Sequence, residues 1–429
     1  MLRSTLLFAT ALSILPLIHA EDTTLHWFKG NTHTHSLWSD GNDFPDMITD
    51  WFVQHGYQFL AMSDHNVLAR GDRWMSEDAI EKRRKALGRK VLVKYRERFG
   101  DEWVQTRTTE TGETEIRLKP LEEYRTRFEK PGQFLLIEGE EVTGQAGSAP
   151  VHINAINVSN VLTPTPDLTE VREVMRSNLQ TIAQHAIDTG KPVLAHVNHP
   201  NFRWAISAED LAHVIEASFF EVFNGHPSTY TQGDPERAES TTDRIWDIAN
   251  TIRLSELKAP PLYGVATDDS HHYHGGDVSP GRGWVMVRAE KLEPDAITAA
   301  MQRGDFYGSS GVTLNDVRFD EATRTLSLEI QPEDGITYTT QFIGTRKGYD
   351  RAVEKVPAPK GDFVKTRLRY SPEVGAILAT SDTLTPSYTL TGNELYVRAL
   401  ITASRAPDNP AWKEQKAQAW TQPVGWTVE

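Results

Sequence analysis

The chain has 429 residues and carries 59 acidic against 45 basic side chains, which gives a formal net charge of −14 at pH 7. Its length fits two domains, or one large barrel with an appended part. So acidic a chain is a poor general binder of nucleic acid or of anionic membranes. The chain contains no cysteine, so disulfides are excluded and any metal ion must be held by histidine and carboxylate groups.

The first twenty residues have the composition of a cleavable secretion signal. Arg3 supplies a positive charge, residues 6–17 are almost all apolar, and Ala20 is a small residue directly before Glu21. The apolar run is too short for a membrane span, and no later stretch reaches the length that a span needs. We therefore expect residues 1–20 to be a signal peptide and the protein to be periplasmic or secreted, without a transmembrane helix.

A pair of histidines follows the first predicted strand. A short apolar run at residues 26–28 leads into a polar loop at residues 30–41. Residues two apart on a strand point to the same side, so His33 and His35 can aim both imidazoles at one point. Asp40 follows in the same loop and can add a carboxylate. A single His-x-His is also common in ordinary polar loops, but together these three side chains make half of a metal site.

The next helix and strand repeat this arrangement. Apolar residues at helical spacing predict a helix over residues 44–56, and a short buried strand is expected at residues 57–62. This strand ends in Asp64 and His65. An acid and an imidazole again follow directly on an apolar strand.

Residues 68–132 interrupt the alternation with highly charged segments. We interpret them as an insertion after the second strand. The insertion is either a solvated surface excursion or a lid over a site. In the second case, Arg70 and Arg73 are the arginines nearest to that site in sequence.

A third strand, expected at residues 134–137, runs into three acidic residues: Glu138, Glu140 and Glu141. Carboxylates gathered at one strand end repel one another unless a positive charge lies among them. An alternating strand at residues 151–158 follows and carries His152. This part of the chain therefore supplies a further histidine and at least one further acid to the same kind of site.

Later strands are expected at residues 192–195, 219–223, 262–266 and 284–287, with helices at 167–189, 207–217, 236–257 and 294–303. The first of these strands runs into His196 and His199, the second into His226, and the third into Asp269 and His271. Strands that alternate with helices imply parallel strands in a right-handed α/β layout. Functional side chains at the carboxyl ends of such strands are typical of a β/α barrel, in which residues far apart in the sequence meet at one face.

Most of the 15 histidines fall at these strand ends. Histidines and carboxylates crowded on one concave face require cations between them. Without thiolates, such a donor set suits divalent zinc, manganese or iron. The donors exceed the roughly three protein ligands of one catalytic zinc, so two or three metal ions are expected.

The pattern changes from about residue 315 onwards. Helical periodicity disappears, turn signals appear, and strand-like runs recur at residues 326–330, 338–343, 388–390 and 395–401. We expect residues 315–429 to form an all-β sandwich, a normal size for a domain. Nothing in this part clusters histidines or acids as a metal site would. The preceding domain is then residues 21–314.

As an ordered set, the motifs resemble the PHP (polymerase and histidinol phosphatase) family. The set spans about residues 26–314 and comprises His-x-His with Ser-Asp-Gly (33–41), Ser-Asp-His (63–65), Gly-Glu-Glu-Val-Thr (139–143), the strand residue His152, His-Pro (199–200) and Asp-x-His (269–271). The resemblance implies a distorted seven-stranded β/α barrel with a centre of two or three metal ions. Members of the family are mostly metal-dependent phosphoesterases.

The resemblance also implies which side chains are the metal ligands: His33, His35 and Asp269 for a first ion, His152 and His199 for a second, and Asp40, His65 and His271 for a third. Glu141 would bridge the first two ions. Glu138 and Glu140 compete with Glu141 for that place. His196 competes with His199, although the Pro200 that follows favours His199.

The expected mechanism is attack by a metal-bound hydroxide, since a bound divalent ion lowers the pKa of its water to about 7. Arg203 is the first candidate to offset the negative charge on a phosphoryl group, ahead of the two arginines of the insertion. Asp64 and Glu221 are expected to orient metal-bound histidines. His226 is expected to protonate the leaving group.

We therefore expect an exported metal-dependent phosphoesterase that hydrolyses a small phosphate mono- or diester. One alternative is a metal-dependent hydrolase of a non-phosphate ester, carbamate or amide, because metal-bound hydroxide also attacks carbonyl groups. Another is a non-catalytic protein that binds a surface or a glycan, with structural metals. Structural sites are closed, whereas catalytic sites keep an open position.

Overall fold

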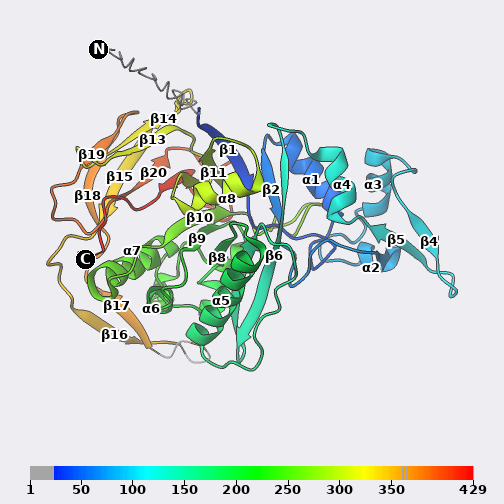
Figure 1. Cartoon of the computed structure of the whole chain (residues 1–429), viewed down its shortest axis with the longest axis horizontal. Coiled ribbons are helices and arrows are strands. Elements are labelled where there is room, and N and C mark those ends of the chain that lie inside the picture. The colour runs from blue at the N-terminus through cyan, green and yellow to red at the C-terminus, as the bar shows by residue number, and fades with distance from the viewer. Residues whose placement is uncertain (1–23, 360–361, 364–365, 429) are drawn as a thin grey trace, which may run out of the picture.

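The computed structural model describes residues 24–359, 362–363 and 366–428. It is a mixed α/β molecule with a large central sheet, which helices flank and further strands extend (Figure 1). The predicted signal peptide, residues 1–20, lies outside the described residues. Within them, no helix combines the length and the apolar character that crossing a membrane requires.

The middle of the central sheet consists of β1 (His26–Asn31), β2 (Phe59–Met62), β6 (Leu135–Ala146), β7 (Ala149–Ile156), β8 (Leu194–Val197), β9 (Phe219–Asn224), β10 (Tyr263–Thr267), β11 (Trp284–Ala289) and β12 (Phe306–Ser309). These strands pair in the order β10-β9-β8-β7-β6-β2-β1-β11-β12. A single parallel bridge between Thr34 and Ser270 also joins the segments that follow β1 and β10. The carboxyl ends of these two strands therefore meet, although a closed seven-stranded barrel stays a prediction.

The strand β7 departs from the expected parallel arrangement. β6 and β7 form an antiparallel hairpin, and Gly147 in its turn has a φ of +61°, which glycine adopts readily. β7 is also antiparallel to β8, whereas β1, β2 and β6 are parallel to one another, as are β8, β9 and β10. The strand expected at residues 134–137 continues to Ala146. The three acidic residues after Ile137 therefore lie within a strand and not beyond its end.

The helices beside this sheet are α1 (Pro45–Gln54), α5 (Val171–Thr189), α6 (Ala208–His213), α7 (Thr242–Ile252) and α8 (Pro294–Gln302). They agree with the expected ranges except in α5, which begins at Val171 and not at residue 167, in α6, which is shorter than 207–217, and in α7, which does not begin at residue 236. Residues 235–237 form a separate 3-10 turn that ends at Ala238 in the left-handed conformation. α7 begins after Thr241, whose hydroxyl accepts a backbone hydrogen bond and caps the helix.

The insertion is a packed part of the molecule and not a solvated excursion. It contains β3 (Arg73–Ser76), α2 (Glu77–Glu81), α3 (Val91–Phe99), β4 (Thr106–Thr108), β5 (Thr114–Leu118) and α4 (Leu121–Phe128), which lie together on one side of the sheet (Figure 1). Tyr95 of α3 stacks on Phe44 at a centroid distance of 4.0 Å. The insertion and the loop after β1 share one hydrophobic core, which includes Leu37 and Trp38. Only its outer elements are strongly charged and exposed.

The C-terminal part consists of β13 (Leu314–Asp320), β14 (Thr325–Ile330), β15 (Tyr338–Gly344), β16 (Val353–Pro357), β17 (Thr366–Tyr370), β18 (Ala376–Ser381), β19 (Ser387–Thr389), β20 (Arg398–Ala403) and β21 (Gln418–Thr421). β21 pairs with β12, so the central sheet continues as β12-β21-β20-β15-β18. The three-stranded sheet β13-β14-β19 shares a hydrophobic core with these strands. The chain is thus strand-rich after residue 315, while a domain boundary at that residue stays a prediction.

A buried ion pair fixes the C-terminal strands to α7. Arg398 of β20 is fully buried, and its guanidinium donates to both carboxylate oxygens of Asp247 at 2.9 and 2.8 Å. The hydroxyl of Tyr396 donates to the same carboxylate at 2.7 Å. The guanidinium carbon of Arg398 also lies 4.6 Å from the ring centroid of Trp246. Removal of one partner would leave the other charge buried and unpaired.

We expect Arg398→Met to lower the free energy of unfolding by about 3–5 kcal/mol, because Asp247 then lacks its cation. Urea unfolding followed by tryptophan fluorescence measures the change. The matched control is Arg369→Met, since Arg369 makes an exposed ion pair with Glu354 and such pairs contribute less than about 1 kcal/mol. Equal losses in the two variants would contradict a stabilising role for the buried pair.

Candidate metal centre

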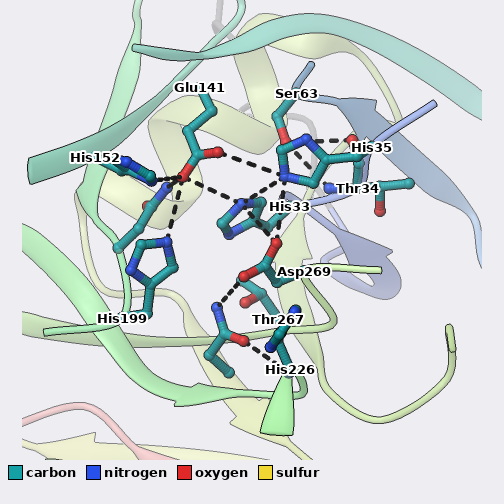
Figure 2. Close-up of polar contacts among 12 residues, drawn as sticks. His33, Thr34, His35, Ser63, Glu141, His152, His199, His226, Thr267 and Asp269 are labelled. Carbon is teal, nitrogen blue, oxygen red and sulfur yellow. Dashed lines mark hydrogen bonds and ion pairs between the residues drawn. The ribbon is translucent and has the colours of Figure 1, made fainter. Parts of the chain in front are cut away.

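The loop that carries the two leading histidines is held between the ends of neighbouring strands. The side-chain oxygen of Asn31 accepts the backbone N–H of His33 at 2.8 Å. The backbone N–H of Thr34 donates to the hydroxyl of Ser63 after β2, and the N–H of His35 donates to the carbonyl of Ser270 after β10, both at 3.0 Å. These bonds fix the backbone, so that the imidazoles of His33 and His35 both point into the site (Figure 2).

Side chains from distant segments meet here in four overlapping groups that could hold metal ions: His33, His35 and Asp269; His33, Glu141 and His199; His65, Glu141 and His152; and His35, Asp40, His65 and His271. Within each group the candidate ligand atoms lie within 4.8 Å of one another. These four groups include every residue predicted above as a metal ligand. Imidazole nitrogens with carboxylate oxygens are a donor set for divalent zinc, manganese or iron.

The carboxylate of Glu141 lies at the centre of the cluster. Figure 2 shows it between His152 and His199 on one side and the leading pair, His33 and His35, on the other. The oxygen–nitrogen distances are 3.0 Å to His152, 3.4 Å to His199 and 3.5 Å to each histidine of the leading pair. Burial would raise the pKa of Glu141, but the surrounding histidines hold it well below its usual range. The side chain is therefore a buried anion.

A second carboxylate, Asp269, faces the leading pair from the end of β10. One of its oxygens lies 3.3 Å from Nε2 of His33 and 3.3 Å from Nε2 of His35. The other oxygen accepts a hydrogen bond from the amide of Asn224 at 3.1 Å. Although burial would raise the pKa of Asp269, the nearby histidines hold it well below its usual range. Its φ of +49° is a strained conformation for a non-glycine residue.

Asp40 marks the open rim of the centre. It is 51% exposed, whereas Glu141 is almost completely buried. One carboxylate oxygen of Asp40 lies 3.3 Å from Nε2 of His271 and 3.6 Å from Nε2 of His65. Burial would raise the pKa of Asp40, but its contacts with these histidines hold the pKa below its usual range. Solvent and ligands can therefore reach the centre from this side.

Hydrogen bonds on the outer nitrogens set the tautomers of two histidines. Nδ1 of His33 lies 2.6 Å from a carboxylate oxygen of Glu221, and Nδ1 of His271 lies 2.8 Å from the carbonyl oxygen of Asp269. These oxygens only accept, so each Nδ1 carries a proton, and Nε2 is the nitrogen that can bind a metal ion when the ring is neutral. Acceptors behind the imidazoles are typical of metal-binding histidines. The expected orienting role of Glu221 fits this contact with His33.

Asp64 acts on the loop and not directly on a histidine. Its carboxylate accepts hydrogen bonds from the backbone N–H and the hydroxyl of Ser36, both at 2.7 Å, and from the hydroxyl of Ser39 at 2.5 Å. The same Ser39 hydroxyl lies 3.4 Å from Nδ1 of His35. Asp64 therefore fixes the loop that positions His35.

His226 lies beside the cluster, with its ring centroid 5.7 Å from that of His271. Burial is the main cause that lowers the pKa of His226 to about 4. Its Nδ1 accepts the backbone N–H of Ser228 at 3.1 Å, so the neutral ring carries its proton on Nε2. His226 is therefore a neutral hydrogen-bond donor at pH 7.

The arginines singled out in the sequence lie elsewhere. The guanidinium carbon of Arg203 lies 5.0 Å from the ring centroid of Phe363, and among the described residues it forms no ion pair. Arg70 pairs with Glu138, and Arg73 donates to the carbonyl of Trp38 and lies over its ring. None of these contacts is with a residue of the four groups.

The structure distinguishes the competing ligand candidates by the groups that their side chains contact. His196 is buried with Nε2 3.2 Å from the hydroxyl of Thr32, and it belongs to none of the four groups. Glu138 faces Arg70, and Glu140 accepts the backbone N–H of Leu162. His199 and Glu141 are thus the members of their sets that reach the cluster.

Two asparagines that the sequence did not single out complete the surroundings. The amide of Asn198 donates to Glu141 at 2.7 Å. The amide of Asn224 donates to Glu221 at 2.8 Å, besides its bond to Asp269. Asn198 lies between His196 and His199 in the chain, and this position was the only signal for it.

Comparisons with known proteins give a weak likeness of fold. No protein-family model matches the chain, and no curated protein matches it. The chain is similar to a two-domain protein from Bacteroides vulgatus that contains a predicted PHP-like metal-dependent phosphoesterase, with 15% identity and a TM-score of 0.39 over 93% of this chain and 96% of that chain.

Two further solved structures have 14% identity and a TM-score of 0.28 over 57% of this chain and 87% of theirs. One is a protein from Bifidobacterium adolescentis proposed to be a metal-dependent phosphoesterase, and the other is an amidohydrolase from Chromobacterium violaceum with bound sulfate and no metal. Likenesses of this size say nothing about activity, so the function must be argued from the site itself.

Proposed function

We propose that this protein is a metal-dependent hydrolase of small phosphate esters, with two or three divalent ions at the histidine and carboxylate cluster. The observation that supports it is the convergence of predicted ligands from distant segments into four overlapping groups. When bound, divalent ions in such a centre acidify a water molecule and polarise the oxygen of the substrate. The exposed rim at Asp40 supports a catalytic centre over a closed structural one.

Two of the three proposed ligand sets lie within single groups, whereas His152 and His199 of the remaining set belong to different groups that share Glu141. His33, His35 and Asp269 would hold a first ion, and Glu141 would be a ligand shared with a second ion. His152 and His199 would hold the second ion, and Asp40, His65 and His271 would hold a third. The buried anionic charge of Glu141 and Asp269 supports these assignments, because two carboxylates among so many imidazoles match the charge of divalent cations. Zinc, manganese and iron are the metals that suit these donors.

The remaining residues position the centre and its substrate. Glu221 holds the tautomer of His33, and Asp64 holds the loop of His35. His226 is neutral at pH 7 and can donate a hydrogen bond from Nε2 to the leaving-group oxygen, whereas its expected role as proton donor requires the protonated ring and stays a prediction. A role of Arg203 in offsetting phosphoryl charge stays a prediction, since its guanidinium lies over Phe363.

The proposal extends to the fold and the location of the protein. Residues 21–314 form a PHP-like barrel with β1, β2 and β6 to β10 as its seven strands, and residues 315–429 form a β-sandwich. The bridge between Thr34 and Ser270 supports closure of the barrel at its carboxyl end. Export to the periplasm or the medium follows from the sequence of residues 1–20 alone.

A substrate comparison with one leaving group tests the reaction class. Protein stripped of metal is reloaded separately with zinc, manganese or iron(II) and assayed with p-nitrophenyl phosphate, bis(p-nitrophenyl) phosphate and p-nitrophenyl acetate. We expect metal-dependent hydrolysis of at least one phosphate ester. Hydrolysis of the acetate alone would replace the proposal with a carboxyl-ester hydrolase, and inactivity with every metal would refute both.

A further inference from the structure

The insertion places a cationic turn beside the open rim of the candidate metal centre. This turn, residues 83–85, follows α2 and contains Arg83, Arg84 and Lys85. The side-chain amide of Asn42 donates to the carbonyl of Arg84 at 3.0 Å, and the backbone N–H of Asn42 donates to the carbonyl of His271, also at 3.0 Å. Asn42 thus ties the cationic turn directly to a segment of the centre.

The cationic turn is anchored on both sides. Ile80 before it and Ala86 after it are fully buried, in the same hydrophobic core as Leu37 and Trp38 of the loop that carries His35. A turn held by a buried residue at each end and by a hydrogen bond in its middle keeps a fixed position. Its side chains can therefore act as a preformed part of the site.

Arg83 is the half-buried member of the cationic turn, and its side chain has no partner. It is half-buried, and its guanidinium makes no hydrogen bond, ion pair or cation–π contact with any other residue in the described part of the chain. The negative charges of Asp40 and Asp64 act on the guanidinium, and Asn42 joins the next residue of the turn to the segment of His271. The positive charges of Arg84 and Lys85 help to lower the pKa of Asp277, and the carboxylate of Asp277 partly offsets those charges.

A half-buried guanidinium without a protein partner has its donors available for an anionic ligand. The planar group donates in a fork that matches a carboxylate or phosphate group. On a chain with a net charge of −14, and beside the exposed carboxylate of Asp40, a local cation is also needed to keep an anionic ligand from being repelled.

We propose that Arg83 determines specificity by binding a second anionic group of the substrate, apart from the reacting phosphoryl group. The preferred substrates are then phosphate esters whose alcohol part carries a carboxylate or another phosphate. This inference rests on the proposed function, because it assigns the reacting phosphoryl group to the metal centre. The turn that carries Arg83 is joined to the segment of His271, and the guanidinium is free to meet the other end of the substrate.

Matched pairs of substrates test the inference. 3-Phosphoglycerate carries a carboxylate where glycerol 3-phosphate carries a hydroxymethyl group. 6-Phosphogluconate and sorbitol 6-phosphate differ in the same way and form a longer pair. We expect the wild-type protein to prefer the carboxylate member of at least one pair. Arg83→Ala should lower kcat/KM for that member by about 10–100-fold, mainly through KM, and should change kcat/KM for the partner that lacks the carboxylate by less than about fivefold.

Two variants separate binding of the anion from general damage. Arg83→Lys keeps the charge without the fork and should restore part of the preference. Arg107→Ala removes a cation of the same insertion that pairs with Glu115 on the outer strands β4 and β5 and should leave the preference unchanged. Equal losses on both members of each pair, or no preference in the wild-type protein, would overturn the inference.

Calorimetric titration of the same four compounds into the metal-loaded wild-type and Arg83→Ala proteins distinguishes this inference from the proposed function. Selective loss of carboxylate binding without hydrolysis by either protein would refute the function and leave the anion site standing. Hydrolysis without any effect of Arg83 would refute the anion site and leave the function standing. Absence of both binding and hydrolysis would refute both.

Discussion

Replacement of Glu141 by glutamine is expected to lower kcat/KM by more than about 100-fold and to reduce the metal content of the purified protein. Substitution of groups that only support metal ligands typically costs about 10–100-fold, and Glu141 is in contact with the ligands themselves. Glutamine keeps the size of the side chain but removes the charge that two divalent ions would share. Measurements of kcat/KM and of bound metal by mass spectrometry, on the same preparation, check both effects.

Glu138→Gln is the matched control for this variant. Glu138 lies three residues earlier in the same strand, but it pairs with Arg70 and belongs to none of the four groups. Since that pair is at the surface, we expect activity within about fivefold of wild type and unchanged metal content. Loss of metal and activity in both variants, or in neither, would show that Glu141 is not the shared ligand.

Removal of metal ions is the second change with a large expected effect. A chelator should abolish activity and lower the free energy of unfolding by about 4 kcal/mol, relative to protein with free metal at about 1,000 times its dissociation constant. The physical reason is that Glu141 and Asp269 are buried anions among histidines, and ions that bind only the folded state stabilise it. Urea unfolding with and without added metal measures this difference.

The stabilisation by metal should also depend on pH. Histidine must be neutral and carboxylates must be ionised in order to bind, so protons compete with the metal. We therefore expect the stabilisation to grow as the pH rises from about 5 to about 8. The Glu141→Gln protein serves as the control and should gain less from metal at every pH. A chelated protein with full activity and unchanged stability would contradict a catalytic metal centre.

The candidate ligands could be proposed from the sequence because most of them follow a short apolar strand, while Glu141 and His152 lie within strands. His33 and His35 lie on one side of the chain because alternate residues of a strand point the same way. The expectation that strand ends converge at one face predicts that His271 lies near them. The same reasoning could not choose between His196 and His199. β8 ends at Val197, and His199 adopts a φ of +26°, a local conformation that no sequence pattern indicated.

The choice among the three acids of β6 depended on strand pairing. Alternation places Glu138 and Glu140 on one side and Glu141 on the other, but only the register decides which side faces the histidines. β6 pairs with β2 so that Glu138 lies opposite Met62, and the bridge between His65 and Glu141 continues this register. Pairing between segments so far apart in the chain cannot be read from local patterns.

Other features of the fold were missed for identifiable reasons. Gly147 and Ser148 separate two alternating runs, which is a hairpin signal, and the structure has an antiparallel hairpin where the alternation of strands and helices predicts parallel strands. The helix predicted from residue 236 begins later, as α7, because Pro235 opens a separate 3-10 turn. The pairing of β12 with β21 joins segments more than a hundred residues apart, and nothing in either strand indicated its partner.

The most direct test is a crystal structure of the purified protein with manganese or zinc, with anomalous difference maps recorded on both sides of the metal absorption edge. The account predicts at least two anomalous peaks among the four groups, with one oxygen of Glu141 bound to each of two ions. Ordered density for the protein with no peak near Glu141 and Asp269, or with metal only at another surface, would contradict it.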